Sequence, residues 1–330
     1  MPSTPTSTCS SGRLPKGERV RSNNDNQLVI AVSSRALFDL EQENRIYEEQ
    51  GIEAYRAFQK AHADEALRPG VAFAFVKRLL RLNERFKDTE PFKVVVLSRN
   101  SPETGQRFFQ SCRHYDLPIK AGAFTSGFPT LPYIDSFDVS LFLSANEESV
   151  KTALSMGLPA GLVLAGDGAP LDEDSEDSLE LRIGFDFDGV IVDDESERQF
   201  QRSGLQGFNE HEEERVNIPH APGPLQKLFQ KLAMFQAMDA ARGKDDPSYH
   251  PVIRVAIVTS RGAPSERRLL TTLESLGIQA AELFLLDGMK KEKILQTFKP
   301  HIFFDDQLRH IAQTAGRIPS VLIPFGVRNT

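Results

Sequence analysis

Residues 181–190 read Leu-Arg-Ile-Gly-Phe-Asp-Phe-Asp-Gly-Val, a mostly apolar run followed at once by two aspartates and a glycine. The apolar part is typical of a short strand buried on both faces. In an open parallel sheet, functional side chains collect where the strands end. We therefore expect Asp186 and Asp188 to face one crevice, with Gly189 allowing the sharp turn that follows.

Similar runs recur along the chain and predict further strands of the same kind. They lie at residues 28–32, 94–97, 139–143, 162–165, 255–258, 283–286, 302–304 and 321–323. Amphipathic stretches between them predict helices, at residues 71–86, 103–115, 147–156, 225–238 and 265–276. Strands that alternate with helices indicate an α/β fold with a doubly wound parallel sheet.

The chain shows signs of an internal duplication. Three blocks recur in one order, residues 30–37 with 183–190, 96–102 with 258–264, and 141–146 with 302–307. Such a repeat predicts two copies of one α/β unit. The expected domains are a polar leader at 1–26, a degenerate half at 27–166, an acidic linker at 167–180, and a catalytic half at 181–330 with a small cap insertion at about 193–254.

Composition excludes several classes of protein. The 330 residues carry a formal net charge of −7, which argues against a general nucleic-acid binder. No apolar run is long enough to cross a bilayer, and the leader lacks the apolar stretch of a secretory signal. With only two cysteines, a disulfide framework is not expected, and we predict a cytoplasmic protein.

Hydroxyl and ammonium groups follow two of the later apolar runs. Thr259 and Ser260 follow the run at 255–258 and could bind phosphate oxygens, although the same residues also serve as helix caps. Lys290 and Lys291 precede a predicted helix, where a lysine can neutralise a phosphoryl group or simply lie in solvent.

Asp305 and Asp306 end the apolar run at 302–304. Adjacent buried carboxylates repel each other and need a cation, and oxygen-only ligands favour Mg²⁺. A carboxylate such as Asp186 can attack phosphorus and form an aspartyl-phosphate. A second carboxylate such as Asp188 can donate a proton to the leaving oxygen and later activate water.

Taken in order, these elements resemble the four motifs of the haloacid dehalogenase superfamily of aspartate-nucleophile phosphatases. Within it, the chain is similar to the cytosolic 5′-nucleotidase type I family over about residues 28–327. The stretches that carry this likeness are 31–38, 143–145, 185–190, 194–198 and 300–307. The resemblance implies a haloacid dehalogenase-like fold and Mg²⁺-dependent hydrolysis of nucleoside 5′-monophosphates such as AMP, through an aspartyl-phosphate.

The resemblance also implies residue roles. Asp186 would be the nucleophile, Asp188 the acid/base, and Lys291 the group that stabilises the phosphate. Lys290 is the alternative, because Glu292 and Lys293 follow where the family has Gly-Pro. Thr259 and Ser260 would bind phosphate, and Mg²⁺ would be held by Asp186, the Asp188 carbonyl, Asp305 and Asp306.

The first half lacks these carboxylates. Ser33 and Arg35 stand in the places of Asp186 and Asp188, and Ser144 and Ala145 replace the later aspartate pair. We expect a non-catalytic copy. Two alternatives to the nucleotidase are a phosphatase of another small phosphomonoester and a non-catalytic nucleotide sensor. The expected partner is a nucleoside monophosphate, with no nucleic acid polymer and no membrane, and the chain is a possible homo-oligomer.

Overall fold

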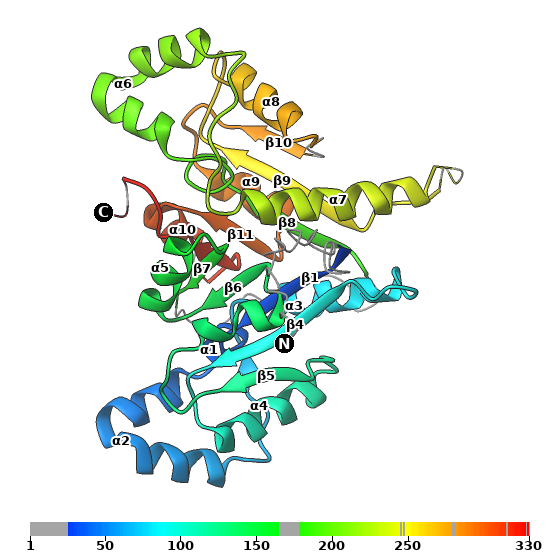
Figure 1. Ribbon diagram of the computed structural model, residues 1–330, viewed down its shortest axis with the longest axis vertical. Coiled ribbons are helices and arrows are strands. Elements are labelled where there is room, and N and C mark those ends of the chain that lie inside the picture. Colours follow the sequence, from blue (N-terminus) through cyan, green and yellow to red (C-terminus); the bar gives the residue numbers. More distant parts are fainter. Residues whose placement is uncertain are drawn as a thin grey trace, which may run out of the picture.

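The computed structural model describes residues 26–164, 178–244, 246, 248–278, 282–314, 316–327 and 329. A single ten-stranded sheet runs through it (Figure 1), with the order β10-β9-β8-β11-β12-β7-β6-β1-β4-β5. Its strands are β1 (Leu28–Val32), β4 (Phe92–Ser98), β5 (Ala121–Phe124), β6 (Leu141–Ser144), β7 (Ala160–Val163), β8 (Leu181–Phe185), β9 (Ile253–Thr259), β10 (Glu282–Leu285), β11 (Ile302–Asp305) and β12 (Ser320–Leu322). All neighbouring pairs are parallel except β7 with β12. The predicted α/β class is confirmed.

Helices follow most strands. They are α1 (Ser34–Leu37), α2 (Glu41–Ala61), α3 (Phe73–Arg81), α4 (Pro102–His114), α5 (Glu147–Ser155), α6 (Glu195–Glu214), α7 (Gln226–Arg242), α8 (Glu266–Ser275), α9 (Lys291–Phe298) and α10 (Leu308–Thr314). A separate small ribbon pairs β2 (Phe38–Asp39) with β3 (Arg68–Pro69) in antiparallel fashion. Three short 3-10 turns, η2 (Leu82–Glu84), η3 (Leu131–Tyr133) and η4 (Asp135–Phe137), complete the regular elements.

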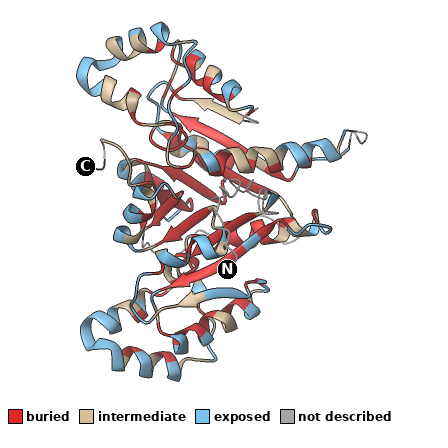
Figure 2. Ribbon diagram, in the orientation of Figure 1, coloured by how far each residue is buried: buried red, intermediate tan, exposed pale blue. Residues whose placement is uncertain are grey.

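Strand β1 shows why its apolar run does not alternate with polar residues. Leu28 and Ile30 join one core cluster, which also contains Phe75 of α3. Val29 joins a second cluster on the other face, which contains Val150 of α5. Both faces of the strand are therefore covered by helices, so that every position is apolar. Figure 2 shows the inner strands of the sheet mostly buried, the edge strands β10 and β5 intermediate or exposed, and exposed residues on the outer sides of the helices.

The two halves of the sheet have the same strand order. From the centre outward, the first half reads β7, β6, β1, β4, β5 and the second reads β12, β11, β8, β9, β10. The halves meet at the antiparallel pair of β7 with β12, where Val321 lies opposite Val163. Each strand of one half thus has a counterpart in the other, in the order expected for two copies of one unit.

The likeness extends to the long helices α2 and α6, which lie at opposite ends of the molecule (Figure 1). Each follows the strand that carries the first recurring block, and each is kinked at a glycine in its middle. Gly51 in α2 has φ 82° and Gly204 in α6 has φ 66°. At this positive φ a residue with a side chain would be strained, so glycine sets the position of both kinks.

Within residues 193–254, the two helices have different surroundings. Helix α7 packs on the sheet, and its Phe229 and Phe235 are part of the main core. Helix α6 belongs to an excursion whose ends are tied together, because Asp193 N donates to Ala221 O at 3.0 Å and Gly223 N donates to Ile191 O at 3.0 Å. Of the expected cap insertion, α6 is therefore the part that stands apart from the sheet.

Some expectations lie outside the described residues, namely most of the leader and residues 167–177 of the linker. The proposed domain boundaries stay a prediction. Strand β5 had no apolar run to predict it, because residues 121–123 are Ala-Gly-Ala at the sheet edge. Among the described helices, none has the length and apolar character needed to span a membrane.

Candidate active site

Two neighbouring parallel strands bring the aspartates of the second half together. Strands β8 and β11 pair in register, with Phe185 opposite Phe304. Asp186 directly follows β8, Asp305 is the last residue of β11, and Asp306 comes next. Asp186 is 4% exposed and Asp305 is fully buried, so the strand ends hold a carboxylate cluster inside the protein.

Lys291 lies between two of these carboxylates. Its Nζ is 2.6 Å from Asp186 Oδ2 and 2.7 Å from Asp305 Oδ2. The residue is 3% exposed and begins helix α9. Lys290, one residue earlier, is exposed. The structure thus places Lys291 rather than Lys290 against the aspartates.

Burial and charge act against each other on the pKa values of these groups. Burial lowers the pKa of Lys291, but Asp186 and Asp305 outweigh it and leave that pKa above its ordinary value. Burial raises the pKa of Asp305, but the Lys291 ammonium and His310 outweigh it and leave the pKa low. Asp186 keeps a pKa raised to about 6, because burial exceeds the effect of Lys291. One cation is shared by two acids, and it fully compensates only one of them.

Asp306 is the uncompensated member of the cluster. Its Oδ1 atom is buried and has no hydrogen-bond partner among the described residues. Burial, together with the charges of Asp186 and Asp305, raises the pKa of Asp306 to about 9. A buried carboxyl oxygen without a donor is a position where a cation would be stabilising.

Gly189 leaves room for the Asp306 carboxyl group. A Cβ atom at Gly189 would lie 2.5 Å from Asp306 Oδ2, and the glycine has φ 73°. The glycine of the opening motif is therefore required both by its backbone conformation and by the close approach of this carboxylate.

The donor set fits a metal ion. Ligand atoms of Asp186, Asp305 and His310 lie within 4.8 Å of one another. His310 Nδ1 is already 3.0 Å from both oxygens of Asp305, and Lys291 occupies the space between Asp305 and Asp186. The free oxygen of Asp306 therefore makes its side of the cluster the better place for a cation. Carboxylate oxygens are the ligands that a hard divalent cation prefers.

Asp188 is held by an arginine that the sequence interpretation did not include in the site. Arg261 Nε donates to Asp188 Oδ2 at 2.8 Å, and Arg261 Nη2 donates to Asp188 Oδ1 at 2.7 Å. This two-bond geometry fixes the plane of the carboxylate. Each oxygen of Asp188 accepts one hydrogen bond from Arg261 and keeps a second lone pair, so a proton can still be exchanged there while the contact to Arg261 is kept.

Arg261 also ties the site to helix α6. Its Nη1 donates to Glu212 Oε2 at 2.5 Å, and Arg268 of α8 donates to the other oxygen of Glu212 at 2.9 Å. Burial raises the pKa of Glu212. The hydrogen bonds and positive charges of His220 and Arg261 outweigh this effect and leave the pKa well below its usual range. The ring of Phe208, also from α6, lies 5.4 Å from the Arg261 guanidinium. The position of α6 is therefore coupled to that of Asp188.

Thr259 and Ser260 lie at the end of β9, next to β8 in the sheet. Thr259 is buried, and its Oγ1 accepts a hydrogen bond from Arg261 N at 3.3 Å. Ser260 is exposed. Both residues lie at the carboxyl ends of the strands, on the same side of the sheet as Asp186. Their contact with phosphate stays a prediction.

The two residues that sequence reasoning missed, Arg261 and His310, both had a signal. Arg261 follows Ser260 in the recurring block Ser-Arg-x-x-Pro, which indicated only the repeat. His310 lies five residues after Asp305, in the first turn of α10. That Arg261 contacts Asp188 and His310 contacts Asp305 was not predictable, because these contacts depend on how the segments after the strands pack together.

Comparison with known proteins adds a family. A family model described as 5′-nucleotidase matches residues 20–330. The chain is 35% identical over 303 residues to human cytosolic 5′-nucleotidase 1B, and this alignment covers 89% of the chain and 48% of the relative. The chain therefore spans about half the length of the curated relative it matches.

Proposed function

The chain belongs to the 5′-nucleotidase family, and on this premise we propose that it hydrolyses nucleoside 5′-monophosphates to nucleoside and phosphate. The family membership confirms the resemblance drawn from the sequence motifs. The observation that carries the proposal is the position of Lys291, within 2.7 Å of both Asp186 and Asp305 at the ends of adjacent strands. A buried ammonium beside a carboxylate nucleophile is the charge that an incoming phosphate needs.

The first chemical step takes place at Asp186. A carboxylate oxygen of Asp186 bonds to phosphorus, the bond from phosphorus to the 5′-oxygen breaks, and Asp188 gives a proton to that oxygen. The products of the step are the free nucleoside and an aspartyl-phosphate. In phosphoryl transfer, positioning and charge stabilisation supply most of the rate enhancement, and here Lys291 supplies positive charge.

The second step regenerates the enzyme. Asp188, now a carboxylate, accepts a proton from water, and the water oxygen bonds to phosphorus while the bond to Asp186 breaks. The two hydrogen bonds from Arg261 hold the Asp188 carboxylate in one plane for this role. Thr259 and Ser260 would hold the phosphate oxygens at the end of β9.

We propose Mg²⁺ as the cofactor. The residues that would hold it are Asp186, the backbone carbonyl of Asp188, Asp305 and Asp306, with the unpaired Oδ1 of Asp306 as the strongest indication. When bound, the ion would offset the negative charge of the phosphate and of the carboxylate cluster.

Substrate choice would depend on α6, since the network from Arg261 through Glu212 couples this helix to Asp188. Closure of such a segment excludes water and orients the leaving group. We also propose a cytoplasmic location, which agrees with the name of the human relative. Another small phosphomonoester is the alternative substrate, because the phosphate-side geometry does not depend on the leaving group.

A substrate panel tests this proposal. The full chain is assayed for phosphate release from AMP, IMP, deoxynucleoside monophosphates and sugar phosphates, each with Mg²⁺ and with EDTA. We expect release from nucleoside monophosphates that EDTA abolishes. Preference for a sugar phosphate would favour the alternative phosphatase, and no release from any compound would overturn the proposal.

A further inference from the structure

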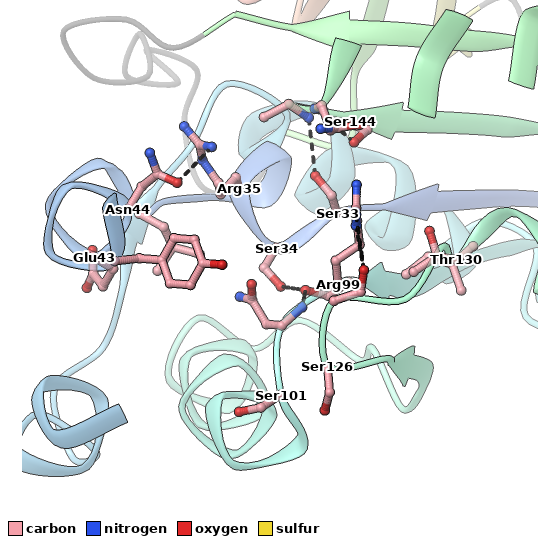
Figure 3. Close-up of a pocket in the computed structure, with 18 of the residues that line it drawn as sticks. Ser33, Ser34, Arg35, Glu43, Asn44, Arg99, Ser101, Ser126, Thr130 and Ser144 are labelled. Atoms are coloured by element: carbon pink, nitrogen blue, oxygen red, sulfur yellow. Dashed lines mark hydrogen bonds between the residues drawn. The ribbon is translucent and has the colours of Figure 1, made fainter. Parts of the chain in front are cut away.

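The first half contains a cavity of about 430 Å³ at the carboxyl ends of β1, β4 and β6. This is the place that corresponds, strand for strand, to the aspartate cluster of the second half. Helix α2 forms one wall, as Figure 3 shows for Glu43 and Asn44. The size is within the range of cavities that take small organic ligands, roughly 300–1,000 Å³.

The cavity floor is rich in hydrogen-bond donors. Figure 3 shows hydroxyl groups from all three strand ends: Ser33 and Ser34 after β1, Ser101 after β4, and Ser144 on β6. Ser101 is 5% exposed, and its Oγ makes no close hydrogen bond among the described residues; the carboxylate that it interacts with, Glu103, is exposed and lies outside the cavity lining. A buried hydroxyl without a close partner in a cavity wall is available to a ligand.

The charge of the lining is positive. Three arginines line the cavity, Arg35, Arg56 and Arg99, and the Nε atom of Arg35 is buried without a partner among the described residues. Arg35 also pairs with Glu41 at 2.7 Å, and Arg56 pairs with Glu53 at 3.2 Å. The side-chain hydrogen bonds of Arg99 go to the carbonyl of Gly127, so among the described residues Arg99 carries the charge that is least compensated. Of the described residues in the wall, Glu43 alone is acidic, and Arg107 compensates it at 2.8 Å. Donors and positive charge together favour an anion with several acceptor oxygens, such as a phosphate group.

The wall formed by α2 also contributes aromatic and apolar side chains. Tyr47 and Tyr55 of α2 line the cavity, and their ring centroids are 6.0 Å apart. Ile52 lies between them in sequence and is 46% exposed. A ligand that reaches from the serine floor to this wall would have a phosphate at one end and a flat apolar group at the other.

We propose that this cavity is a second, non-hydrolytic site for a phosphate-bearing small molecule of the nucleoside monophosphate class. Ser33 occupies the place of the nucleophile, and Ser144 and Ala145 occupy those of the paired aspartates. The site therefore has no carboxylate at the positions of the nucleophile and of the paired aspartates, and its one lining carboxylate among the described residues, Glu43, is paired with Arg107. The proposal rests on the cavity and its lining, and it does not depend on hydrolysis in the other half.

Ser33 allows a matched pair of variants. Its Oγ accepts hydrogen bonds from Ala36 N and Ala145 N, both at 3.3 Å. Aspartate and asparagine are equally good helix caps, so both Ser33→Asp and Ser33→Asn should preserve the local fold. Only Ser33→Asp adds a negative charge, which would repel a phosphate group.

Equilibrium dialysis of labelled AMP against the full chain measures the number of sites. All proteins carry Asp186→Asn so that the probe survives, and product chromatography verifies this. We expect two AMP molecules per chain with Ser33→Asn, and with Ser33→Asp one site retained while the other weakens by roughly tenfold or more. Competition with inorganic phosphate and with adenosine separates the phosphate end from the base. Phosphate should displace the second AMP, and adenosine should not.

The proposal would be overturned if Ser33→Asn and Ser33→Asp bound the same number of AMP molecules, one or two, with the same affinities. Displacement by adenosine alone would also overturn it. If Ser33→Asp lowers the melting temperature markedly, Arg99→Gln at the exposed edge of the cavity replaces it, with the same expected loss. Hydrolysis of AMP by the wild-type chain is assayed separately, so a failed cavity and a failed nucleotidase give different results.

Discussion

Arg261 holds both carboxylate oxygens of Asp188, at 2.7 and 2.8 Å, and it is a buried residue that links helix α6 to the candidate active site. The pair joins the strand-end cluster to the segment above it. A two-point contact of this kind fixes the direction in which the carboxylate can exchange a proton, and misplacement of an acid/base group by a fraction of an ångström slows catalysis.

Arg261→Lys tests this relationship. Lysine keeps the positive charge but cannot make the two parallel hydrogen bonds. We expect kcat for AMP hydrolysis to fall by roughly 10- to 100-fold, with a smaller change in KM, because substrate binding at Lys291 is untouched. The matched control is Arg254→Lys near the start of β9, the strand that precedes Arg261, because the partners of Arg254, Glu180 and Glu282, lie away from the site. An unchanged kcat in Arg261→Lys would show that Asp188 does not need this partner.

The raised pKa of Asp306 leads to a prediction of how the free energy of unfolding depends on pH. Its pKa is raised to about 9 and that of Asp186 to about 6, against about 4 in an unfolded chain. Between these values the folded chain binds more protons than the unfolded one, so stability falls as pH rises. In EDTA, the free energy of unfolding should therefore decrease from pH 5 to pH 9, by about 1 kcal/mol per pH unit from Asp306, with a further contribution from Asp186 only up to about pH 6.

Mg²⁺ should oppose the loss of stability at high pH, because it stabilises the ionised carboxylates. The increase in melting temperature on adding Mg²⁺ should be small at pH 5 and larger at pH 8. Asp306→Asn should flatten the slope in EDTA and remove most of the Mg²⁺ effect. An equal Mg²⁺ effect at both pH values, or a full effect in Asp306→Asn, would contradict the assignment of this residue.

Gly189→Ala separates steric from conformational effects. The new Cβ would meet Asp306 Oδ2 at 2.5 Å, so we expect the Mg²⁺ concentration needed for half-maximal activity to rise by roughly tenfold or more. Gly277→Ala is the control, since Gly277 has a similar φ of 67° with nothing within 4 Å of the added atom. Both variants should lose about 1–2 kcal/mol of stability from the strained backbone. Equal Mg²⁺ requirements in the two variants would argue against a metal site beside Gly189.

The sequence predicted the strands well where apolar residues were continuous. The run at 181–185 coincides with β8, and all five of its residues are buried, Arg182 included, as expected for a strand covered on both faces. The edge strand β5 and the kinked helices α2 and α6 were missed. Their residues are small, charged or mostly exposed, so their conformation depends on neighbours that the local sequence does not show.

The sequence predicted which strand ends form the candidate site. It did not predict which side chains contact each other there. Any parallel sheet brings the strand ends that carry Asp186 and Asp305 to the same side. Their proximity depends in addition on β8 and β11 being neighbours in the sheet, which the order of the apolar runs along the sequence does not give. That Lys291 would lie between the two aspartates depends on the register of α9. That Arg261 would choose Asp188 and Glu212 depends on the loop after β9, for which no periodic pattern exists.

Replacing the nucleophile tests the central claim most directly. Steady-state phosphate release from AMP with saturating Mg²⁺ is compared between the wild-type chain and Asp186→Asn, with folding checked by circular dichroism. Asparagine has nearly the same shape but is not a nucleophile, so we predict a loss of roughly 10⁴-fold or more in kcat. A folded Asp186→Asn protein that hydrolyses AMP at close to the wild-type rate would contradict the account.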